Sequence, residues 1–187
     1  MNRIDLLAEK YSRHIGAPWQ RTIAGAQRVI VLVYDKELER SLRARMPAFE
    51  MATRQAGRTW QNIDLAPAFA EWMAADEYRE AYFDSPEDLR LKLDAEFPEY
   101  VADWIRTTLV DPEVTEETVV GVFGIGALFG LVRVSQILKM VESDIRGRLL
   151  VFFPGQYEGS NYRLLDARDG WNYLAIPITA HGEGDYA

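Results

Sequence analysis

One glycine-rich segment of the chain has a spacing that could serve phosphate binding. The stretch VVGVFGIGALFGLVRVSQIL, residues 119–138, is an apolar run that carries Gly124, Gly126 and Gly130. A mononucleotide loop also needs a lysine followed by serine or threonine, because the amine neutralises phosphate charge and the hydroxyl holds magnesium. Residues 127–129 are instead alanine, leucine and phenylalanine. The sequence therefore argues against an intact phosphate-binding loop.

A dinucleotide-binding turn is the second possibility for the same glycines. That motif wants an acidic residue at the end of the following strand, where it binds a ribose, but the following strand here ends in FFPG. We favour a third interpretation, in which Gly124 and Gly126 permit a tight strand-to-helix turn and Gly130 lets the helix lie close to the sheet. We therefore expect that ATP, GTP and NAD do not bind and that the protein has no cofactor.

The other reactive side chains form no recognisable catalytic or metal-binding set. The histidines, His14 and His181, lie far apart, and neither has a serine or acid at the spacing of a triad or metal site. The chain has no cysteine, which excludes disulfides and thiolate metal sites. Adjacent carboxylates such as Asp76 and Glu77 stand in charged stretches typical of solvated surfaces. We expect a protein that is not an enzyme and that holds no metal.

An excess of aromatic residues marks the segment PAFAEWMAADEYREAYF, which is predicted as one helix. Trp72, Tyr78, Tyr82 and Phe83 occupy more than one side of that helix and cannot all face one sheet. Two interpretations are equally open. Some of these side chains bind a partner, or the long helix predicted to begin at Ser85 covers them.

A second unusual stretch, FFPGQYEG, follows the next predicted strand. The strand is expected to end at Phe153 and Pro154, so that Gly155, Tyr157 and Gly159 form a shaped loop at the carboxyl edge of the sheet. Open α/β folds place their sites at this edge. The loop is our second choice for a partner-binding surface, after the aromatic helix.

Arg133 is the one cation within the apolar region after the glycine turn. We expect it in the first turns of the following helix, on the buried side. An arginine in such surroundings needs a carboxylate or carbonyl partner, so it is either a structural fork or an anion contact. We favour the structural role, in which its removal leaves a partner unpaired.

Strands and helices alternate along the chain, which predicts an α/β fold: a mostly parallel sheet of about five strands flanked by helices. The layout is P-loop-like or Rossmann-like, without an intact phosphate-binding motif. Short apolar runs predict the strands RVIVLVYD, TWQNIDLA, VVGVFGIG, RLLVFFPG and WNYLAIPI. We expect a single domain over residues 1–187, with an N-terminal helix over 1–16, a helical insertion over 66–113 and a frayed tail over 181–187.

Several helices have boundaries that the sequence suggests. Ile4, Leu7, Tyr11 and Ile15 recur at helical spacing and predict an amphipathic first helix. Residues 36–55 are predicted as one kinked helix or two short ones. The helix after residue 84 is expected to be kinked or divided by a proline at position 98, and residues 127–143 are predicted as the helix that follows the glycine turn.

The net charge limits the kinds of partner. Acidic residues outnumber basic ones, 29 against 21, for a formal charge of -8. Such a protein repels phosphate backbones and anionic lipid surfaces, so we expect no direct DNA binding and no membrane association. The best basic cluster within one segment, Arg40, Arg43 and Arg45, is diluted by Glu37 and Glu39 and is interpreted as a solvated helix face.

Nothing in the sequence predicts export or membrane insertion. The first residues, MNRIDLLAEKYSRHIG, contain Asp5 and Glu9 and lack the apolar core of a signal peptide. The apolar run that begins at Val119 is interrupted by Arg133 before it reaches the roughly 20 residues that a membrane-spanning helix needs. We expect a cytoplasmic protein.

The motifs of the second half together resemble a known family. VFGIGALFGLVRVSQIL, then LLVFFPGQYEG, then an aromatic pair before a final strand, are similar to the C-terminal half of the BrxB family of bacterial BREX phage-exclusion systems. The resemblance covers residues 118–178 well. Upstream, RVIVLVYDKELERSL resembles the family's first strand and helix, while residues 50–113 match only in layout. Where the family pattern has a polar Ser-His pair after the arginine, this chain has Val134 and Ser135.

The resemblance implies a non-enzymatic component of anti-phage defence. It implies that this component acts beside a methyltransferase, a large ATPase and a PglZ-type protein, of which the last is the expected direct partner. The alternative is a degenerate nucleotide-binding domain with a regulatory role. The resemblance implies that the following residues are structural parts of the family motif: Gly124, Gly126, Arg133, Phe153, Pro154, Gly155, Tyr157 and Gly159.

Overall fold

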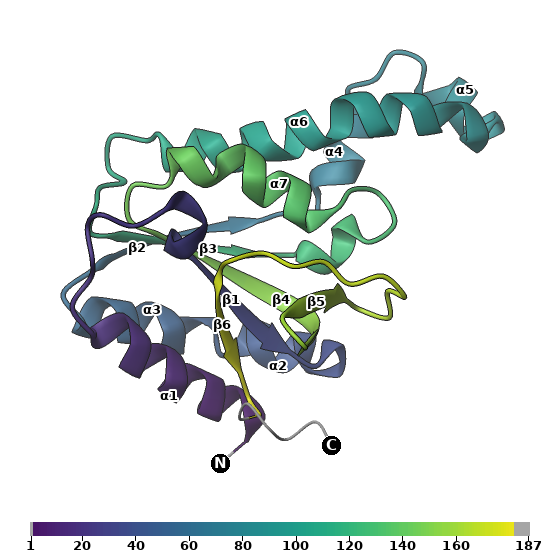
Figure 1. The fold of residues 1–187 in the computed structure, drawn as a ribbon. Coiled ribbons are helices and arrows are strands. Elements are labelled where there is room, and N and C mark those ends of the chain that lie inside the picture. The colour runs from purple at the N-terminus through teal and green to yellow at the C-terminus, as the bar shows by residue number, and fades with distance from the viewer. Residues whose placement is uncertain (1, 182–187) are drawn as a thin grey trace.

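A parallel sheet runs through the centre of the protein (Figure 1). The computed structural model describes residues 2–181, so all but the first residue of the predicted tail lies outside the described residues. The strand order is β2-β3-β4-β1-β6, every neighbouring pair is parallel, and β5 pairs antiparallel with the end of β4. The strands are β1 (Val29–Tyr34), β2 (Thr59–Asp64), β3 (Thr118–Phe123), β4 (Arg148–Glu158), β5 (Asn161–Leu164) and β6 (Ile176–Thr179). The predicted α/β class with a mostly parallel sheet is confirmed.

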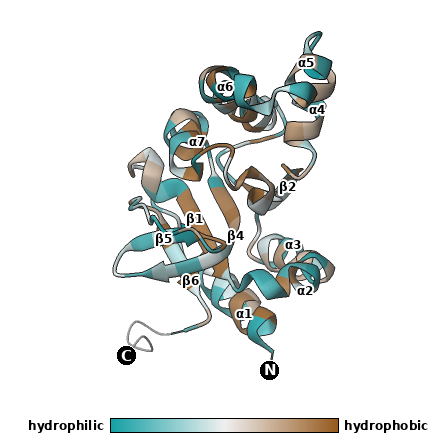
Figure 2. Ribbon diagram, turned by 90° about the vertical axis from the view of Figure 1, so that its right-hand side faces the viewer, coloured by the Kyte–Doolittle hydropathy of each residue, from teal (hydrophilic) through white to brown (hydrophobic). Residues whose placement is uncertain are grey.

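Helices cover both faces of the sheet, and each face has its own apolar core (Figures 1 and 2). Alternate residues of a strand point to opposite faces. In β1, for example, Ile30 and Leu32 enter one core, while Val31 and Val33 enter the other. This explains why the central strands appear in the sequence as continuous apolar runs.

The first face is covered by α1 (Arg3–Gly16), α2 (Glu39–Ala44) and α3 (Met46–Gln55). The four apolar residues that predicted the first helix are all buried in it, which confirms the amphipathic stripe. The Tyr11 and Thr53 hydroxyls, 2.6 Å apart, are hydrogen-bonded and join α1 to α3. Residues 36–55 form two helices rather than one, and Pro47 stands in the first turn of the second.

The second face is covered by α4 (Ala68–Ala74), α6 (Leu89–Leu109) and α7 (Val134–Val141), with the short α5 (Arg79–Asp84) beyond them. α6 is continuous over 21 residues, so of the two expected effects of Pro98, a kink or a division, the division is wrong. Pro98 is itself buried, and the helix packs along α7 with Leu93, Phe97 and Val101 inward. Tertiary burial of this stripe compensates for the single backbone hydrogen bond that proline removes.

Short 3-10 turns occupy several connections: η1 (Gly25–Arg28), η2 (Lys36–Leu38), η3 (Pro86–Asp88), η4 (Ile125–Leu128) and η5 (Glu142–Asp144). In the part of the chain that the structure describes, no helix has both the length and the hydropathy that crossing a bilayer requires.

Three predicted boundaries in the second half are wrong. The helix expected over 127–143 begins only at Val134, because η4 and a loop precede it. β4 does not end at its Pro-Gly pair but continues to Glu158 and forms a hairpin with β5. The last strand is limited to Ile176–Thr179, and Trp171 makes only an isolated bridge with Tyr162.

Candidate functional site

The glycine turn after β3 is closed by protein atoms. Gly124 has φ +79°, and a Cβ at this position would lie 2.4 Å from the Ala66 nitrogen and 2.5 Å from Asp64 Oδ1. Only glycine fits such a position. The neighbouring Asp64 carboxylate also makes this a poor place for phosphate. The interpretation that a glycine turns the chain here is confirmed for Gly124.

The other two glycines have different roles from those predicted. A Cβ on Gly126 would make only ordinary contacts, the nearest with Pro154 Cγ at 3.5 Å. Gly130 lies in the loop before α7 with φ +76°, and a Cβ there would meet nothing within 4 Å. The prediction that Gly130 brings the helix close to the sheet is therefore wrong. Glycine is favoured at position 130 because the backbone there is left-handed, and not because space for a side chain is lacking.

Arg133 is exposed at the start of α7, so the predicted buried structural fork is wrong. Within the described residues it makes no hydrogen bond or ion pair through its side chain. It lines a shallow pocket together with Phe129 and Trp171, where the loop after β3 meets the segment after β5. The two halves of the family motif thus meet in space.

We predict that Arg133→Ala changes the free energy of unfolding by less than about 0.5 kcal/mol, as is usual for an exposed residue without a partner. Urea denaturation of the purified protein measures this. Arg106→Ala is the control, because Arg106 donates to Asp144 Oδ2 at 2.9 Å and to the Met140 carbonyl at 3.2 Å, and so joins α6 to α7. Equal losses in the two variants would contradict the assignment of Arg133 to the surface.

The predicted loop at Pro154–Gly159 is a hairpin with an aromatic interior. Pro154 is buried, and a Cβ on Gly155 would lie 2.0 Å from the Arg163 carbonyl oxygen. The Tyr157 ring lies 4.6 Å from that of Tyr162, between centroids. Packing therefore accounts for most of this motif, and it offers a partner little beyond the half-buried Tyr157.

The aromatic segment consists of two short helices, not the single helix predicted. Trp72 is 9% exposed and its ring lies 5.0 Å from that of Phe97, so it belongs to the core. The hypothesis that it binds a partner is wrong. Tyr82 is half-buried beside Lys92. The interpretation in which the long helix covers the aromatics is thus correct for Trp72 and partly for Tyr82.

Two aromatics of the segment remain at the surface. Tyr78 is 67% and Phe83 is 63% exposed, and Leu91 at the start of α6 is 84% exposed. α5 itself has no buried residue. Figures 1 and 2 both place it at the outer end of the helical layer, away from the sheet. We call Tyr78 and Phe83, beside and on α5, the aromatic corner.

A polar contact fixes the turn that presents this corner. Asp76 Oδ1 accepts a hydrogen bond of 2.8 Å from the Tyr78 backbone, and its other oxygen is paired with Lys92. The Lys92 ammonium and this backbone N–H lower the pKa of Asp76. The prediction of a solvated Asp76 is wrong, since it is only 9% exposed. The α4–α5 turn is thereby tied to α6.

A cleft lies at the carboxyl edge of the sheet, lined by the last residues of β1 and β6 and by Gly155 and Gln156 of β4. Figure 1 shows this edge of the sheet. Open α/β folds place ligands in such a position. Tyr34, Gln156 and Thr179 line it together with Lys36 and Asp166, which are ion-paired. The residues directly after β1 are Asp35, Lys36 and Glu37, a segment without the glycines that a phosphate-binding turn needs there.

Several arginines lie together at the opposite, amino edge of the sheet. This cluster was not predicted from the sequence. The interpretation of Arg43 and Arg45 as a balanced surface is confirmed, because Arg43 is paired with Glu39 at 2.7 Å and Arg45 with Asp5 at 2.8 Å. Arg28, Arg58 and Arg148 lie in a different place, each at the beginning of a strand.

Comparison with protein-family models shows to which family the chain belongs. A family model described as BREX protein BrxB matches residues 69–178. The chain belongs to the BrxB family. Searches of curated proteins and of solved structures found no match.

The BrxB match extends further upstream than the motifs of the second half alone suggested. It includes nearly all of α4, all of α5 and α6, and hence the aromatic corner. Residues 50–113 were predicted to share only their layout with the family. That prediction is wrong for residues 69–113, which the family model matches. As a BrxB protein, the chain is a component of BREX phage defence, associated with other BREX proteins.

Proposed function

We propose that the protein is a non-enzymatic assembly subunit of its BREX system and that it binds a PglZ-type protein directly. The observation that carries the proposal is the aromatic corner, where Tyr78 and Phe83 are exposed on and beside a helix that buries nothing. This corner lies within the region that matches the family.

The α5 helix has little to stabilise it within this chain. An isolated helix of six residues is unstable in water, and α5 adds no buried side chain of its own to the core. Large aromatic side chains that are held out by such an element are typical of interface centres. A partner that covers the aromatic corner would bury them and stabilise the helix.

The remaining surface supports an assembly role rather than chemistry. In residues 2–181 no group of three or more histidine, cysteine or acidic side chains is arranged to hold a metal ion. The cleft at the carboxyl edge contains an ion pair rather than a phosphate-binding turn. These features favour the assembly subunit over a degenerate nucleotide-binding domain.

Co-purification tests the proposal. The protein is co-expressed with the PglZ-type protein of the same BREX system, which carries an affinity tag, and the pair is isolated at low salt. We expect a stable complex that forms without DNA. The proposal fails if the two proteins, each shown to be folded, never co-purify.

The aromatic corner gives a sharper prediction. Phe83→Ala should weaken the complex by about 2 kcal/mol, or roughly 30-fold in Kd, since aromatic side chains at an interface centre commonly contribute that much. Titration calorimetry with the purified partner measures it. Met51→Ala is the control, because Met51 is 59% exposed on α3, on the other face of the sheet. If both variants bind as tightly as wild type, the contact lies elsewhere.

A further inference from the structure

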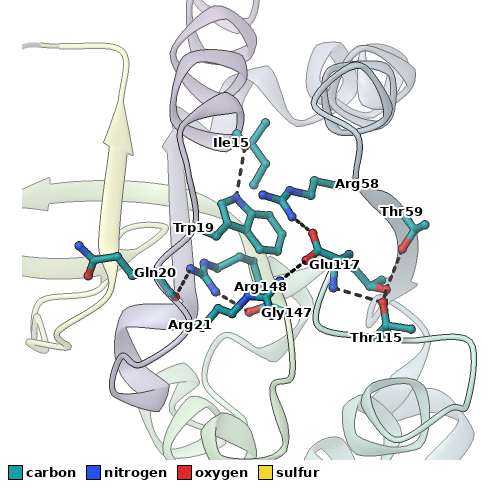
Figure 3. A network of polar contacts seen from close by, with 11 residues as sticks. Ile15, Trp19, Gln20, Arg21, Arg58, Thr59, Thr115, Glu117, Gly147 and Arg148 are labelled. Atoms are coloured by element: carbon teal, nitrogen blue, oxygen red, sulfur yellow. Dashed lines mark hydrogen bonds and ion pairs between the residues drawn. The ribbon is translucent and has the colours of Figure 1, made fainter.

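Five arginines meet in a pocket at the amino edge of the sheet: Arg21, Arg28, Arg58, Arg146 and Arg148. Arg21 and Arg28 come from the loop and the 3-10 helix η1 before β1, Arg58 is the residue before β2, and Arg146 and Arg148 lie just before β4 and at its first position. Parallel strands begin at the same edge, so residues far apart in the sequence are brought together here. Figure 3 shows Arg58 and Arg148 on either side of Trp19. We call this group the arginine pocket.

The arginine pocket is strongly cationic within an acidic protein. Two glutamates, Glu116 and Glu117, also line it, so five guanidinium groups against two carboxylates leave a formal charge of +3. The whole chain carries -8. Glu117 is already shared, since it is paired with Arg58 and lies 3.8 Å from Arg21. The charges in the pocket are therefore far from balanced.

Arg148 is the most confined of these cations. It is only 8% exposed, and its side chain donates to the carbonyls of Gly147 at 3.0 Å and Gln20 at 3.1 Å. No carboxylate is paired with it among the described residues. Burial lowers the pKa of Arg148, and so do the charges of Arg28 and Arg58. A buried cation of this kind is costly unless an anion accompanies it.

Arg58 has one buried donor that its pairing with Glu117 leaves unsatisfied. Its Nε is buried and has no hydrogen-bond partner. The positive field reaches further, because the charge of Arg148 lowers the pKa of His14 in addition to the larger effect of burial. An unsatisfied buried donor and an excess of positive charge both favour a bound anion.

Trp19 restricts what that anion can be. Its ring lies 4.0 Å from the Arg58 guanidinium carbon and 4.6 Å from that of Arg148, and its Nε1 donates to the Ile15 carbonyl at 3.2 Å. A ring held between two cations is not available for stacking on a nucleobase. The pocket therefore suits a compact anion recognised by guanidinium groups alone.

We propose that the arginine pocket binds a compact, multiply charged oxyanion of the phosphate class. Backbone carbonyls hold the guanidinium groups of Arg28, Arg146 and Arg148 in place by accepting hydrogen bonds from them. Together with Arg21 and Arg58, these cations face the pocket from different elements, which suits an anion with oxygens on several sides better than one planar carboxylate. The surplus of positive charge likewise favours a dianion. Anion binding at the arginine pocket does not depend on the proposed binding of a PglZ-type protein.

Calorimetric titration with inorganic phosphate and with pyrophosphate, at constant ionic strength against chloride, tests the proposal. We expect saturable binding of at least one of them. Arg58→Gln and Arg21→Gln should each weaken it about tenfold or more, since a hydrogen bond to a charged group contributes on that scale. Arg21 is 80% exposed in its side chain, so its variant keeps the test valid if Arg58→Gln does not fold.

Arg54→Gln is the matched control, because Arg54 is exposed and paired with Glu50 on α3, outside the pocket. Titration with ATP separates free phosphate from a nucleotide as the source. ATP that binds here competes with pyrophosphate and is weakened by Arg21→Gln, whereas ATP bound at the carboxyl edge is not.

Three results would overturn the proposal. The first is that neither anion binds saturably. The second is that Arg21→Gln and Arg54→Gln bind the anion equally well, which would place it elsewhere. The third is that a glutamate-rich peptide or duplex DNA binds at the arginine pocket while phosphate and pyrophosphate do not.

Discussion

Trp72→Ala should lower the free energy of unfolding by about 3–5 kcal/mol, the usual cost of truncating a buried aromatic residue. Trp72 is 9% exposed and packs between Phe69, at 6.1 Å between ring centroids, and Phe97, at 5.0 Å. Its removal leaves a cavity beneath α4 that the surrounding helices cannot fill. Urea denaturation followed by circular dichroism measures the loss.

Phe83→Ala is the control for this prediction, because Phe83 belongs to the same aromatic segment but is 63% exposed. Its variant should stay close to wild type in stability. A Trp72→Ala protein that keeps its stability but no longer binds the partner would contradict the assignment of Trp72 to the core. It would indicate that Trp72 belongs to the binding surface.

Gly124→Ala should also be strongly destabilising, by more than about 2 kcal/mol. Two costs combine at this position: a left-handed backbone with φ +79°, and a Cβ that would lie 2.4 Å from the Ala66 nitrogen. The added methyl group would separate the turn after β3 from the end of β2.

Gly130→Ala separates the two costs. Gly130 has nearly the same backbone conformation, φ +76°, but open space where a Cβ would stand. It should therefore lose only the conformational part, about 1 kcal/mol. Denaturant midpoints of the two variants give the comparison. Equal losses would mean that the contact with β2 contributes nothing and that the turn is held by conformation alone.

Local patterns predicted the fold well where one periodicity dominated. The stripe of Ile4, Leu7, Tyr11 and Ile15 defined the first helix, and continuous apolar runs marked the buried parallel strands. The predictions were wrong where tertiary packing opposes local preference. α6 continues through Pro98 because its buried stripe outweighs one lost hydrogen bond.

The candidate site was predicted only in part, for a similar reason. Composition identified the aromatic segment, but which of its rings lie at the surface depends on where α6 passes. Trp72 and Tyr78 are six positions apart in one segment, yet one is core and the other is exposed. No local pattern separates them.

Part of the arginine pocket could have been predicted from the sequence. Arg28, Arg58 and Arg148 introduce three predicted strands, in QRVIVLV, GRTWQNI and GRLLVFF. In a parallel sheet these strand beginnings meet at one edge, so the three arginines could have been placed together. The burial of Arg148 and the lack of a carboxylate paired with it among the described residues could not be predicted, because both depend on loops with no periodic pattern.

Phage plating tests the central claim most directly, namely that the aromatic corner joins this protein to its BREX system. Cells that carry the complete system receive wild-type protein, the Tyr78→Ala and Phe83→Ala double variant, or Met51→Ala, with the stability of each protein checked. We predict that the double variant loses protection while Met51→Ala keeps it. A folded double variant that protects as fully as wild type would contradict the account.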